Sequence, residues 1–235
     1  MEALVLAGGK AERMGDAAQG LPKPLVPIAG IPLAGYTVGR LVAAGVTRII
    51  VACRAGYEDA FVDGLGGLGA EIVAVGETTP LGRGGGFRLA ASRREESGNV
   101  LALNGDELLD LDFHALLSDH EQGAAAATIV VAQVNSPFGV VDVEDDGTVT
   151  GFREAPKLDQ WVNSGVYVLG EEALALFPEK GDHEMSTFPQ LAAERRLRAH
   201  RHTGVWLTVN TPKDLRRAAE FMEEHPDWKP QRQLA

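Results

Sequence analysis

The chain has 235 residues, of which 45% are hydrophobic, and a formal net charge of −11 at pH 7. This length suits one large domain or two small ones with a sizeable core, and the composition argues against disorder. A negative charge of this size repels nucleic acids and anionic membrane surfaces, so neither is expected as a partner.

The N-terminal segment does not resemble a signal peptide, because its apolar run breaks at Gly8-Gly9 and no basic segment precedes it. No apolar run approaches the roughly 18 residues of a membrane span. Cys53 is the only cysteine, which excludes an intramolecular disulfide. It follows the apolar run IIVA and is expected inside a strand, and a single cysteine favours a reducing, cytoplasmic location.

The first half of the chain alternates strand-like and helix-like segments. Strands are expected at residues 3–7, 48–53, 71–75 and 99–105, and helices at 32–45 and 84–95. In the first helix, the inward positions are Leu33, Val38, Leu41 and Val42. This alternation predicts an α/β fold, with a mostly parallel sheet and helices on both of its faces.

The pattern changes after residue 124, where four strand-like runs follow one another. They cover residues 127–134, 138–144, 149–154 and 161–169. Asp145-Asp146-Gly147 supplies a hairpin turn between the second and the third. The second half is therefore expected to add antiparallel strands to the sheet, and the chain is expected to end in a helix and a polar tail. No linker or internal repeat divides the chain, so one continuous domain is expected.

Three segments carry candidate functional residues at the carboxyl ends of predicted strands, where open α/β sheets bind ligands. They are Gly8 to Arg13, Gly82 to Gly86, and Asn104-Gly105-Asp106. Gly8-Gly9 would let backbone N–H groups approach an anion, although a plain strand-exit turn explains the two glycines equally well. Nearby cations favour the anion site, and they are Lys10, Arg13 and Lys23.

Neither GxGxxG nor GxxxxGK[ST] follows the first strand, so the dinucleotide and Walker motifs are both absent. Asp106 is a candidate ligand for a hard cation such as Mg²⁺, which binds through one or two carboxylates and substrate phosphates. The alternative is a turn aspartate that bonds only to its own loop.

Taken together, the motifs resemble those of the sugar-1-phosphate nucleotidyltransferase family. The matching segments, in order, are LAGGKAERMG, LPKPLVPIAGIPL, TTPLGRGGG, LALNGDELLDLD, FREAP, WVNSGVYVL and VWLTVNTPKDL. The chain is similar in size to short bacterial members that lack a C-terminal left-handed β-helix and act on heptose, hexose or N-acetylmuramate 1-phosphates. The resemblance implies a Rossmann-like three-layer fold, with a nucleotide-binding half at 1–124, a sugar-phosphate-binding half at 125–225 and a tail at 226–235.

The resemblance also implies a reaction and a site. Relatives transfer a nucleoside monophosphate from an NTP to a sugar 1-phosphate and release pyrophosphate, with Mg²⁺ as cofactor. By this resemblance, Arg13 and Lys23 are catalytic and Asp106 binds the metal. The implied nucleotide-binding residues are Leu6, Ala7, Gly8, Gly9, Glu77, Gly82, Asn104 and Gly105. The implied sugar-phosphate-binding residues are Gly139, Glu154, Lys157 and Asn163.

The base is suggested by Glu77, which falls where relatives place a base-reading residue. A carboxylate can accept from two donors on the Watson–Crick edge of guanine, whereas uracil offers one. This favours GTP over UTP, and the alternative is a solvated loop acid. The sequence leaves the sugar open among hexoses, heptoses and octoses. It also leaves the oligomeric state open, and a homodimer is compatible with it.

The chain departs from the family pattern at several positions. Ala11 stands where a third glycine is usual, and Arg83 replaces a small hydroxyl residue. Ala155 replaces the lysine of Glu-Lys-Pro, which makes Lys157 the candidate substitute. Thr208 stands where the second metal-binding aspartate is usual, so a weaker or altered metal site is expected. Glu107 is a candidate contributor, although adjacent residues of one strand point to opposite faces.

Two other functions compete with the transferase. A nucleotide- or sugar-phosphate-binding regulatory subunit without catalysis is suggested by Thr208 and Ala155. An NAD-dependent oxidoreductase rests only on the α/β alternation, and the missing GxGxxG counts against it. Among the histidines, His183 precedes Glu184 in an expected loop and is assigned to the surface.

Overall fold

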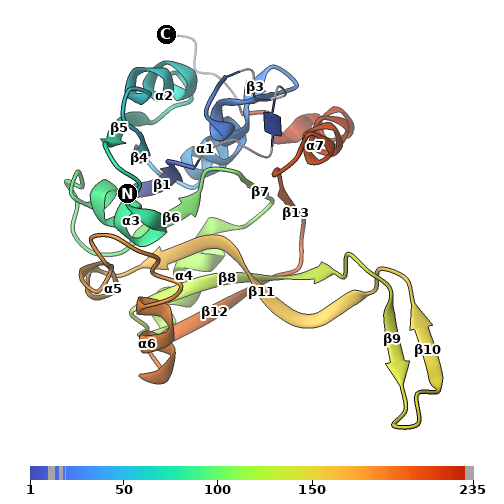
Figure 1. Cartoon of the computed structure of the whole chain (residues 1–235). Helices are drawn as coiled ribbons and strands as arrows, with labels where there is room; N and C mark the ends of the chain where they lie inside the picture. Colours follow the sequence, from blue (N-terminus) through green and yellow to red (C-terminus); the bar gives the residue numbers. More distant parts are fainter. Residues whose placement is uncertain (10–13, 16–17, 19, 231–235) are drawn as a thin grey trace.

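The computed structural model describes residues 1–9, 14–15, 18 and 20–230. Its central element is a seven-stranded sheet with the strand order β12-β8-β11-β6-β1-β4-β5 (Figure 1). The strands of this sheet are β1 (Glu2–Ala7), β4 (Arg48–Arg54), β5 (Glu71–Glu77), β6 (Val100–Asn104), β8 (Ala127–Asn135), β11 (Lys157–Leu169) and β12 (Leu197–His202). β1 pairs in parallel with β4 and β6, whereas β11 runs antiparallel to both of its neighbours, β6 and β8.

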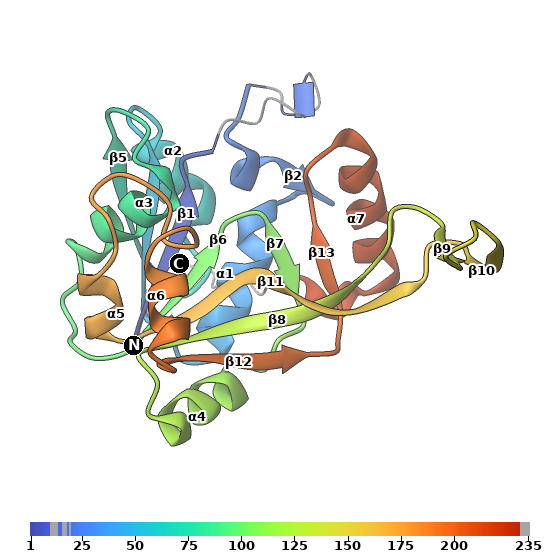
Figure 2. The same cartoon turned by 60° about the horizontal axis from the view of Figure 1, so that its bottom comes forward.

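Helices cover both faces of the sheet, which makes three layers (Figure 2). The α-helices are α1 (Leu33–Ala43), α2 (Glu58–Leu65), α3 (Gly82–Ala91), α4 (Phe113–Gly123), α5 (Glu171–Ala175), α6 (Thr187–Ala193) and α7 (Pro212–Glu224). Successive residues of a strand point to opposite faces, so Ala3 and Val5 of β1 pack with Leu41 of α1 and Phe61 of α2, while Leu4 packs with Phe87 of α3. The predicted fold class is confirmed.

Several short elements complete the chain. They are the 3₁₀ turns η2 (Lys23–Leu25) and η3 (Pro226–Trp228), and the strands β2 (Pro27–Ile28), β3 (Ile31–Pro32), β7 (Glu107–Leu109), β9 (Val140–Val143), β10 (Val149–Arg153) and β13 (Trp206–Thr208). β7 pairs with β13, which brings the chain after residue 205 back beside the end of β6. Trp228 is buried in a third core cluster with Tyr36 and Met222, so the packed part of the molecule continues past residue 225.

The antiparallel strands predicted for the second half are present, but two of them lie outside the main sheet. β9 and β10 form a separate two-stranded ribbon. Both views show this ribbon projecting from the body beyond the ends of β8 and β11 (Figures 1 and 2). Its connection contains the predicted turn, in which Gly147 has φ +88° and donates its N–H to the Glu144 carbonyl.

No helix among the described residues has both the length and the apolar content that crossing a bilayer would need.

Candidate active site

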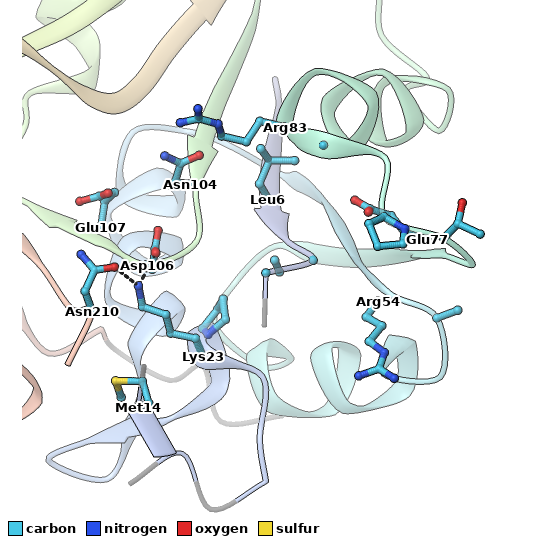
Figure 3. Close-up of a pocket in the computed structure, with 18 of the residues that line it drawn as sticks. Leu6, Met14, Lys23, Arg54, Glu77, Arg83, Asn104, Asp106, Glu107 and Asn210 are labelled. Atoms are coloured by element: carbon cyan, nitrogen blue, oxygen red, sulfur yellow. Dashed lines mark hydrogen bonds and ion pairs between the residues drawn. The ribbon is translucent and has the colours of Figure 1, made fainter. Parts of the chain in front are cut away.

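A cavity of about 1040 Å³ opens at the carboxyl ends of the parallel strands (Figure 3). Gly8 and Gly9 follow β1, Arg54 ends β4, Glu77 ends β5 and Asn104 ends β6, and all of them line this cavity. Open α/β sheets bind their ligands at this edge, and the volume is at the upper end of the range for small-molecule sites. The cavity is therefore the candidate active site.

Lys23 connects three distant parts of the chain on one wall of the cavity. Its Nζ lies 2.5 Å from Asp106 Oδ2 and donates to Asn210 Oδ1 at 2.8 Å. Lys23 is the first residue of the 3₁₀ turn η2 and has Pro22 before it and Pro24 after it. Each proline ring fixes its own φ and so restricts the backbone beside the lysine. The Lys23 side chain is nearly buried, and it is held in place before any ligand arrives.

Glu77 lies across the cavity from Lys23, against the glycine turn after β1. A Cβ at Gly8 would lie 3.0 Å from Glu77 Oε1, and one at Gly86 would lie 2.8 Å from the same atom. The Leu81 N–H donates to Glu77 Oε2 at 3.2 Å. Burial raises the pKa of Glu77 despite this hydrogen bond. Gly8 therefore has a specific role, which is to leave room for a carboxylate at the cavity wall.

Asp106 and Glu107 both line the cavity although they are adjacent in sequence. Asp106 lies in the turn between β6 and β7, while Glu107 is the first residue of β7, so strict strand alternation does not apply to this pair. The Trp206 indole N–H donates to Glu107 Oε2 at 2.8 Å. Burial, and secondly the Asp106 charge, raise the pKa of Glu107 to about 8.

These residues provide part of a site for a hard cation. Carboxylate oxygens are the ligands that Mg²⁺ prefers, and Mg²⁺ usually takes only one or two from the protein. Within the described part of the chain, no cluster of three or more His, Cys, Asp or Glu side chains could hold a metal alone. The donor set of Asp106 and Glu107 fits Mg²⁺ that shares its coordination with substrate phosphates.

Arg83 lines the cavity and is held by two acidic side chains of the loop before α6. Its Nε donates to Asp182 Oδ2 at 2.8 Å, and its Nη1 lies 2.7 Å from Glu184 Oε2. Glu184 Oε1 in turn accepts from Asn163 Nδ2 and the Tyr167 hydroxyl, both at 3.0 Å. Arg83 thus ties the start of α3 to the strand that carries Asn163.

The glycines at the start of α3 mainly serve close packing. A Cβ at Gly84 would lie 2.8 Å from Pro178 Cδ, and one at Gly85 would lie 2.5 Å from the Glu179 carbonyl oxygen. Gly82, at φ +77°, is the glycine of this group that lines the cavity. The loop at 178–183 therefore lies directly on the helix N-terminus.

The structure brings together most of the predicted nucleotide-site residues, and it separates others from them. The predicted residues that line the cavity are Leu6, Ala7, Gly8, Gly9, Lys23, Glu77, Gly82, Asn104 and Asp106. Gly105 does not line it, and donates its N–H to the Leu6 carbonyl at 2.8 Å behind the wall. Arg13 lies outside the described residues.

The four predicted sugar-phosphate residues do not line the cavity: Gly139, Glu154, Lys157 and Asn163. The first three lie at the root of the ribbon, where Glu154 and Lys157 are exposed. Asn163 contacts Glu184, and a Cβ at its neighbour Gly165 would lie 2.4 Å from Asn104 Nδ2. Of the four residues, Asn163 is therefore the one that the structure connects to the cavity wall, because nearby Gly165 packs against Asn104.

Sequence reasoning missed Arg54 and misplaced His183. Arg54 follows Cys53 at the end of β4, and the rule that sites lie at strand ends could have found it. The surface assignment of His183 is wrong, because its side chain is fully buried among Phe87, Phe177 and Phe188. Neither ring nitrogen has a hydrogen-bond partner among the described residues. Burial lowers the pKa of His183 to about 4.

Comparison with known proteins agrees with this geometry. The profile of the family described as "Nucleotidyl transferase" matches residues 2–225. The chain belongs to the nucleotidyl transferase family. Family membership accounts for the nearly continuous match of the motifs along the chain, and it leaves no support for a nicotinamide-dependent oxidoreductase.

Curated relatives of the family are about one-third identical to this chain over the aligned residues. A mannose-1-phosphate guanylyltransferase of Mycobacterium tuberculosis is 31% identical over 231 residues, which cover 93% of this chain and 64% of that protein. The catalytic subunit beta of the same enzyme from Drosophila pseudoobscura is 32% identical over 91% of this chain and 60% of its own length. The chain thus spans less than two thirds of these relatives.

Solved structures of other proteins have the same fold. HddC from Yersinia pseudotuberculosis has a TM-score of 0.72 at 24% identity, over 94% of this chain and 99% of that one. The inositol-1-phosphate CTP transferase from T. maritima also has a TM-score of 0.72, at 23% identity, over 95% of each chain. These likenesses support the Rossmann-like nucleotidyltransferase fold.

Proposed function

We propose that this chain transfers a nucleoside monophosphate, preferably GMP, from an NTP to a sugar 1-phosphate. The observation that carries the proposal is the contact of Lys23 with Asp106 on the wall of a cavity of about 1040 Å³. The contact joins a cation and a carboxylate at the strand ends where the glycine turn also lies, and this supports phosphate binding by Lys23 and metal binding by Asp106. Each of these features alone has a purely structural explanation, but their presence together at one cavity wall favours phosphate transfer.

The reaction balances without an external acid or base. An oxygen of the sugar 1-phosphate attacks the α-phosphorus, forming one P–O bond while the bond to the β-phosphate bridging oxygen breaks and pyrophosphate leaves. The phosphate of the acceptor is already mostly dianionic near neutral pH, because the second pKa of a phosphate monoester is about 6. Positioning and charge stabilisation therefore supply most of the catalysis.

The glycine turn, Lys23 and Arg13 have proposed roles in this step. The Gly8-Gly9 backbone and Lys23 line the cavity. In the proposed reaction, the glycine backbone binds the NTP phosphates and the Lys23 ammonium binds the α-phosphate and the acceptor phosphate. In the free protein Lys23 is neutralised by Asp106. Substrate phosphates would release this contact, since they replace the aspartate as the partner of the lysine. Arg13 stays a predicted ligand of the pyrophosphate part of the NTP.

Asp106 and Glu107 are the residues that would hold Mg²⁺. When bound, Mg²⁺ neutralises phosphate charge and stabilises the departing pyrophosphate. Asp106 is free to turn toward the metal once Lys23 contacts phosphate. Glu107 would supply the second carboxylate, with the metal displacing its proton, in a chain that has Thr208 in place of the usual aspartate. The presence of this carboxylate weighs against a regulatory subunit without catalysis.

Glu77 is the proposed reader of the base. Its carboxylate stands at the end of β5 beside the glycine turn, where it can accept from two donors of guanine. The relatives named above are guanylyltransferases, and HddC has been solved in complex with GMP-PN. These names support GTP over UTP as the donor.

The acceptor is proposed as a hexose, heptose or octose 1-phosphate, and mannose 1-phosphate is the first to test because the curated relatives are named for it. Gly139, Glu154, Lys157 and Asn163 remain the predicted sugar-phosphate residues. The division into halves at residue 124 and a cytoplasmic location also remain predictions.

The deciding experiment is pyrophosphate release with each NTP and each sugar 1-phosphate, in Mg²⁺ or Mn²⁺. We expect the highest kcat/KM for GTP, and the NDP-sugar should appear in equal amount to pyrophosphate. Binding of GTP without any turnover across the panel would instead support the regulatory subunit. A preference for UTP would overturn the assigned role of Glu77 but not the reaction class.

A further inference from the structure

Arg83 stands at the start of α3, at a position where the family resemblance places a small hydroxyl residue. Its side chain lines the cavity and is 46% exposed. It extends toward the side of the cavity that carries Asn104 and Glu107, away from Glu77 (Figure 3). A long cationic side chain therefore reaches toward the half of the cavity opposite the proposed base reader.

The guanidinium of Arg83 is already paired with two carboxylates. Its Nε donates to Asp182 Oδ2 at 2.8 Å, and its Nη2 donates to the same oxygen. Its Nη1 lies 2.7 Å from Glu184 Oε2. One positive charge thus faces two negative charges. A phosphate brought to this arginine would meet the repulsion of both carboxylates, so Arg83 is poorly suited to bind the acceptor phosphate itself.

Glu184 connects Arg83 to Asn163. Its other oxygen, Oε1, accepts from Asn163 Nδ2 and from the Tyr167 hydroxyl, each at 3.0 Å. Asn163 Nδ2 also donates to the Tyr167 hydroxyl at 2.9 Å, and Asn163 Oδ1 accepts from the Gly165 N–H at 2.9 Å. The amide nitrogen therefore faces acceptors and the amide oxygen faces a donor, which fixes one orientation of the amide. Asn163 is exposed, so this fixed amide is accessible to a ligand.

We propose that Arg83 is a positioning residue for the acceptor sugar, because it holds Glu184 where Glu184 orients the Asn163 amide for a sugar hydroxyl. This inference rests on the proposed function, in which Asn163 contacts the acceptor. An amide that is fixed before binding loses less conformational freedom when it meets a hydroxyl, and it therefore contributes more to affinity. Arg83 thus acts on acceptor binding through Glu184, without touching the substrate.

Backbone contacts hold the 178–183 loop on α3 independently of the Arg83 side chain. The Gly181 carbonyl accepts from the Gly84 N–H at 3.0 Å, and the Gly181 N–H donates to the Leu81 carbonyl at 2.7 Å. Removing the Arg83 guanidinium releases the Asp182 and Glu184 side chains but leaves these backbone contacts. A variant such as Arg83→Leu should therefore fold, with a local loss of order around Glu184.

The test is the dissociation constant of the sugar 1-phosphate that reacts best in the pyrophosphate assay, with mannose 1-phosphate as the first probe. Isothermal titration calorimetry measures it with a non-hydrolysable GTP analogue bound. Arg83→Leu should weaken sugar 1-phosphate binding about 3- to 10-fold, the range of one net neutral hydrogen bond, and leave the affinity for the GTP analogue unchanged. Arg83→Lys should restore part of the loss, because an ammonium can still pair with Glu184.

The matched control is Arg88→Leu, further along α3. Arg88 Nη1 donates to the Phe177 carbonyl at 2.8 Å, directly before the same loop, and this arginine does not line the cavity. Arg88→Leu also removes an arginine that ties α3 to this region, but it leaves Glu184 and Asn163 untouched. Its affinity for sugar 1-phosphate should equal that of the wild type.

Deoxy analogues separate positioning from a merely structural role. In the wild type, removal of the hydroxyl that Asn163 binds should weaken binding about 3- to 10-fold. In Arg83→Leu, removal of the same hydroxyl should cost nothing further, because the amide no longer waits in place for it. A set of monodeoxy sugar 1-phosphates identifies that hydroxyl, and Asn163→Ala should abolish the sensitivity to the same one.

A double variant tests the connection through Glu184. Glu184→Gln should weaken binding as Arg83→Leu does, and the two together should be no worse than either alone, since both act on one contact. Additive losses would show that Arg83 touches the substrate itself and would overturn the proposal. Normal turnover with wild-type affinity in Arg83→Leu would refute this inference alone.

Failure of the proposed function has a different signature. Sugar 1-phosphates that bind to the wild type without turnover would refute the transferase, and the Arg83 comparison would still be decided by the dissociation constants. Sugar 1-phosphates that neither bind nor react would refute the transferase and the role of Arg83 together.

Discussion

Glu107 and Thr208 are direct partners in the antiparallel pairing of β7 with β13. Partners of this kind point to the same side of a strand pair. The Glu107 carboxylate therefore approaches, from β7, the region that an acidic side chain at position 208 would reach from β13. Resemblance to the family places a metal-binding aspartate at 208, and in this chain the carboxylate stands on the opposite strand.

Metal binding should depend on Glu107 and on nucleotide. The protein offers two carboxylates, so Mn²⁺ should bind weakly to the free chain and more tightly with a GTP analogue that completes the coordination. Glu107→Gln should weaken Mn²⁺ in the ternary complex about 10- to 100-fold. Adding Thr208→Asp to this variant should restore most of the affinity. Electron paramagnetic resonance of free Mn²⁺ measures the Mn²⁺ affinity of both variants without requiring turnover.

The control for metal binding is Glu121→Gln, which removes an exposed carboxylate from α4. It should leave Mn²⁺ affinity unchanged. Wild-type affinity in Glu107→Gln would remove Glu107 from the metal site and leave Asp106 as the sole assigned carboxylate.

Lys23 should be required for the chemical step more than for folding. Lys23→Met removes the ammonium that we place on the α-phosphate while keeping the stem, and kcat should fall about 10²- to 10³-fold, as for other single charge-stabilising donors. The matched control is Lys213→Met on the exposed start of α7, which should keep wild-type kcat. Single-turnover pyrophosphate release separates the chemical step from binding. An unchanged rate in Lys23→Met would refute its catalytic role.

Glu77 should set the preference between GTP and UTP. In Glu77→Gln, the charged acceptor for the two guanine donors is replaced by a neutral amide with one acceptor oxygen. Hydrogen bonds to charged groups contribute about 1.5–3 kcal/mol, so the GTP-to-UTP ratio of kcat/KM should fall about 10- to 100-fold. Glu71→Gln, at the exposed start of the same strand, should leave the ratio unchanged. Equal losses for both nucleotides would assign Glu77 a structural role only.

The sequence predicted the features that depend on local pattern. Alternating apolar runs predicted the parallel strands, and the rule for strand ends placed Gly8, Asn104 and Asp106 at one edge. Glu77 was found only through the resemblance to the family. The Asp145–Gly147 turn was readable because its residues favour a hairpin.

Features that depend on contacts between distant parts of the chain could not be predicted from the sequence. Glu107 looked unsuitable because strand alternation was assumed through Asp106, whereas the structure has a turn there. The depth of His183 depends on the loop at 178–183 lying on the glycines of α3, a contact about 100 residues away in sequence. The departure of the β9–β10 ribbon from the sheet leaves Gly139 and Glu154 outside the cavity, and no local pattern reports such a departure.

Buried His183 should make the protein less stable as the pH falls. Its pKa is lowered to about 4 from an ordinary 6.5, so between these values the unfolded chain binds a proton that the folded chain does not. The contribution of neutral His183 to the free energy of unfolding is therefore fully present above about pH 6.5. It is lost as the pH falls toward 4, by on the order of 2 kcal/mol between pH 7.5 and pH 5. His183→Leu should remove this loss and, by eliminating two buried nitrogens without partners, stabilise the fold by about 1 kcal/mol at pH 7.5. Urea unfolding at both pH values measures the effect, with His114→Gln on the exposed face of α4 as the control. Parallel losses in wild type and His183→Leu would show that His183 takes up its proton in the folded state.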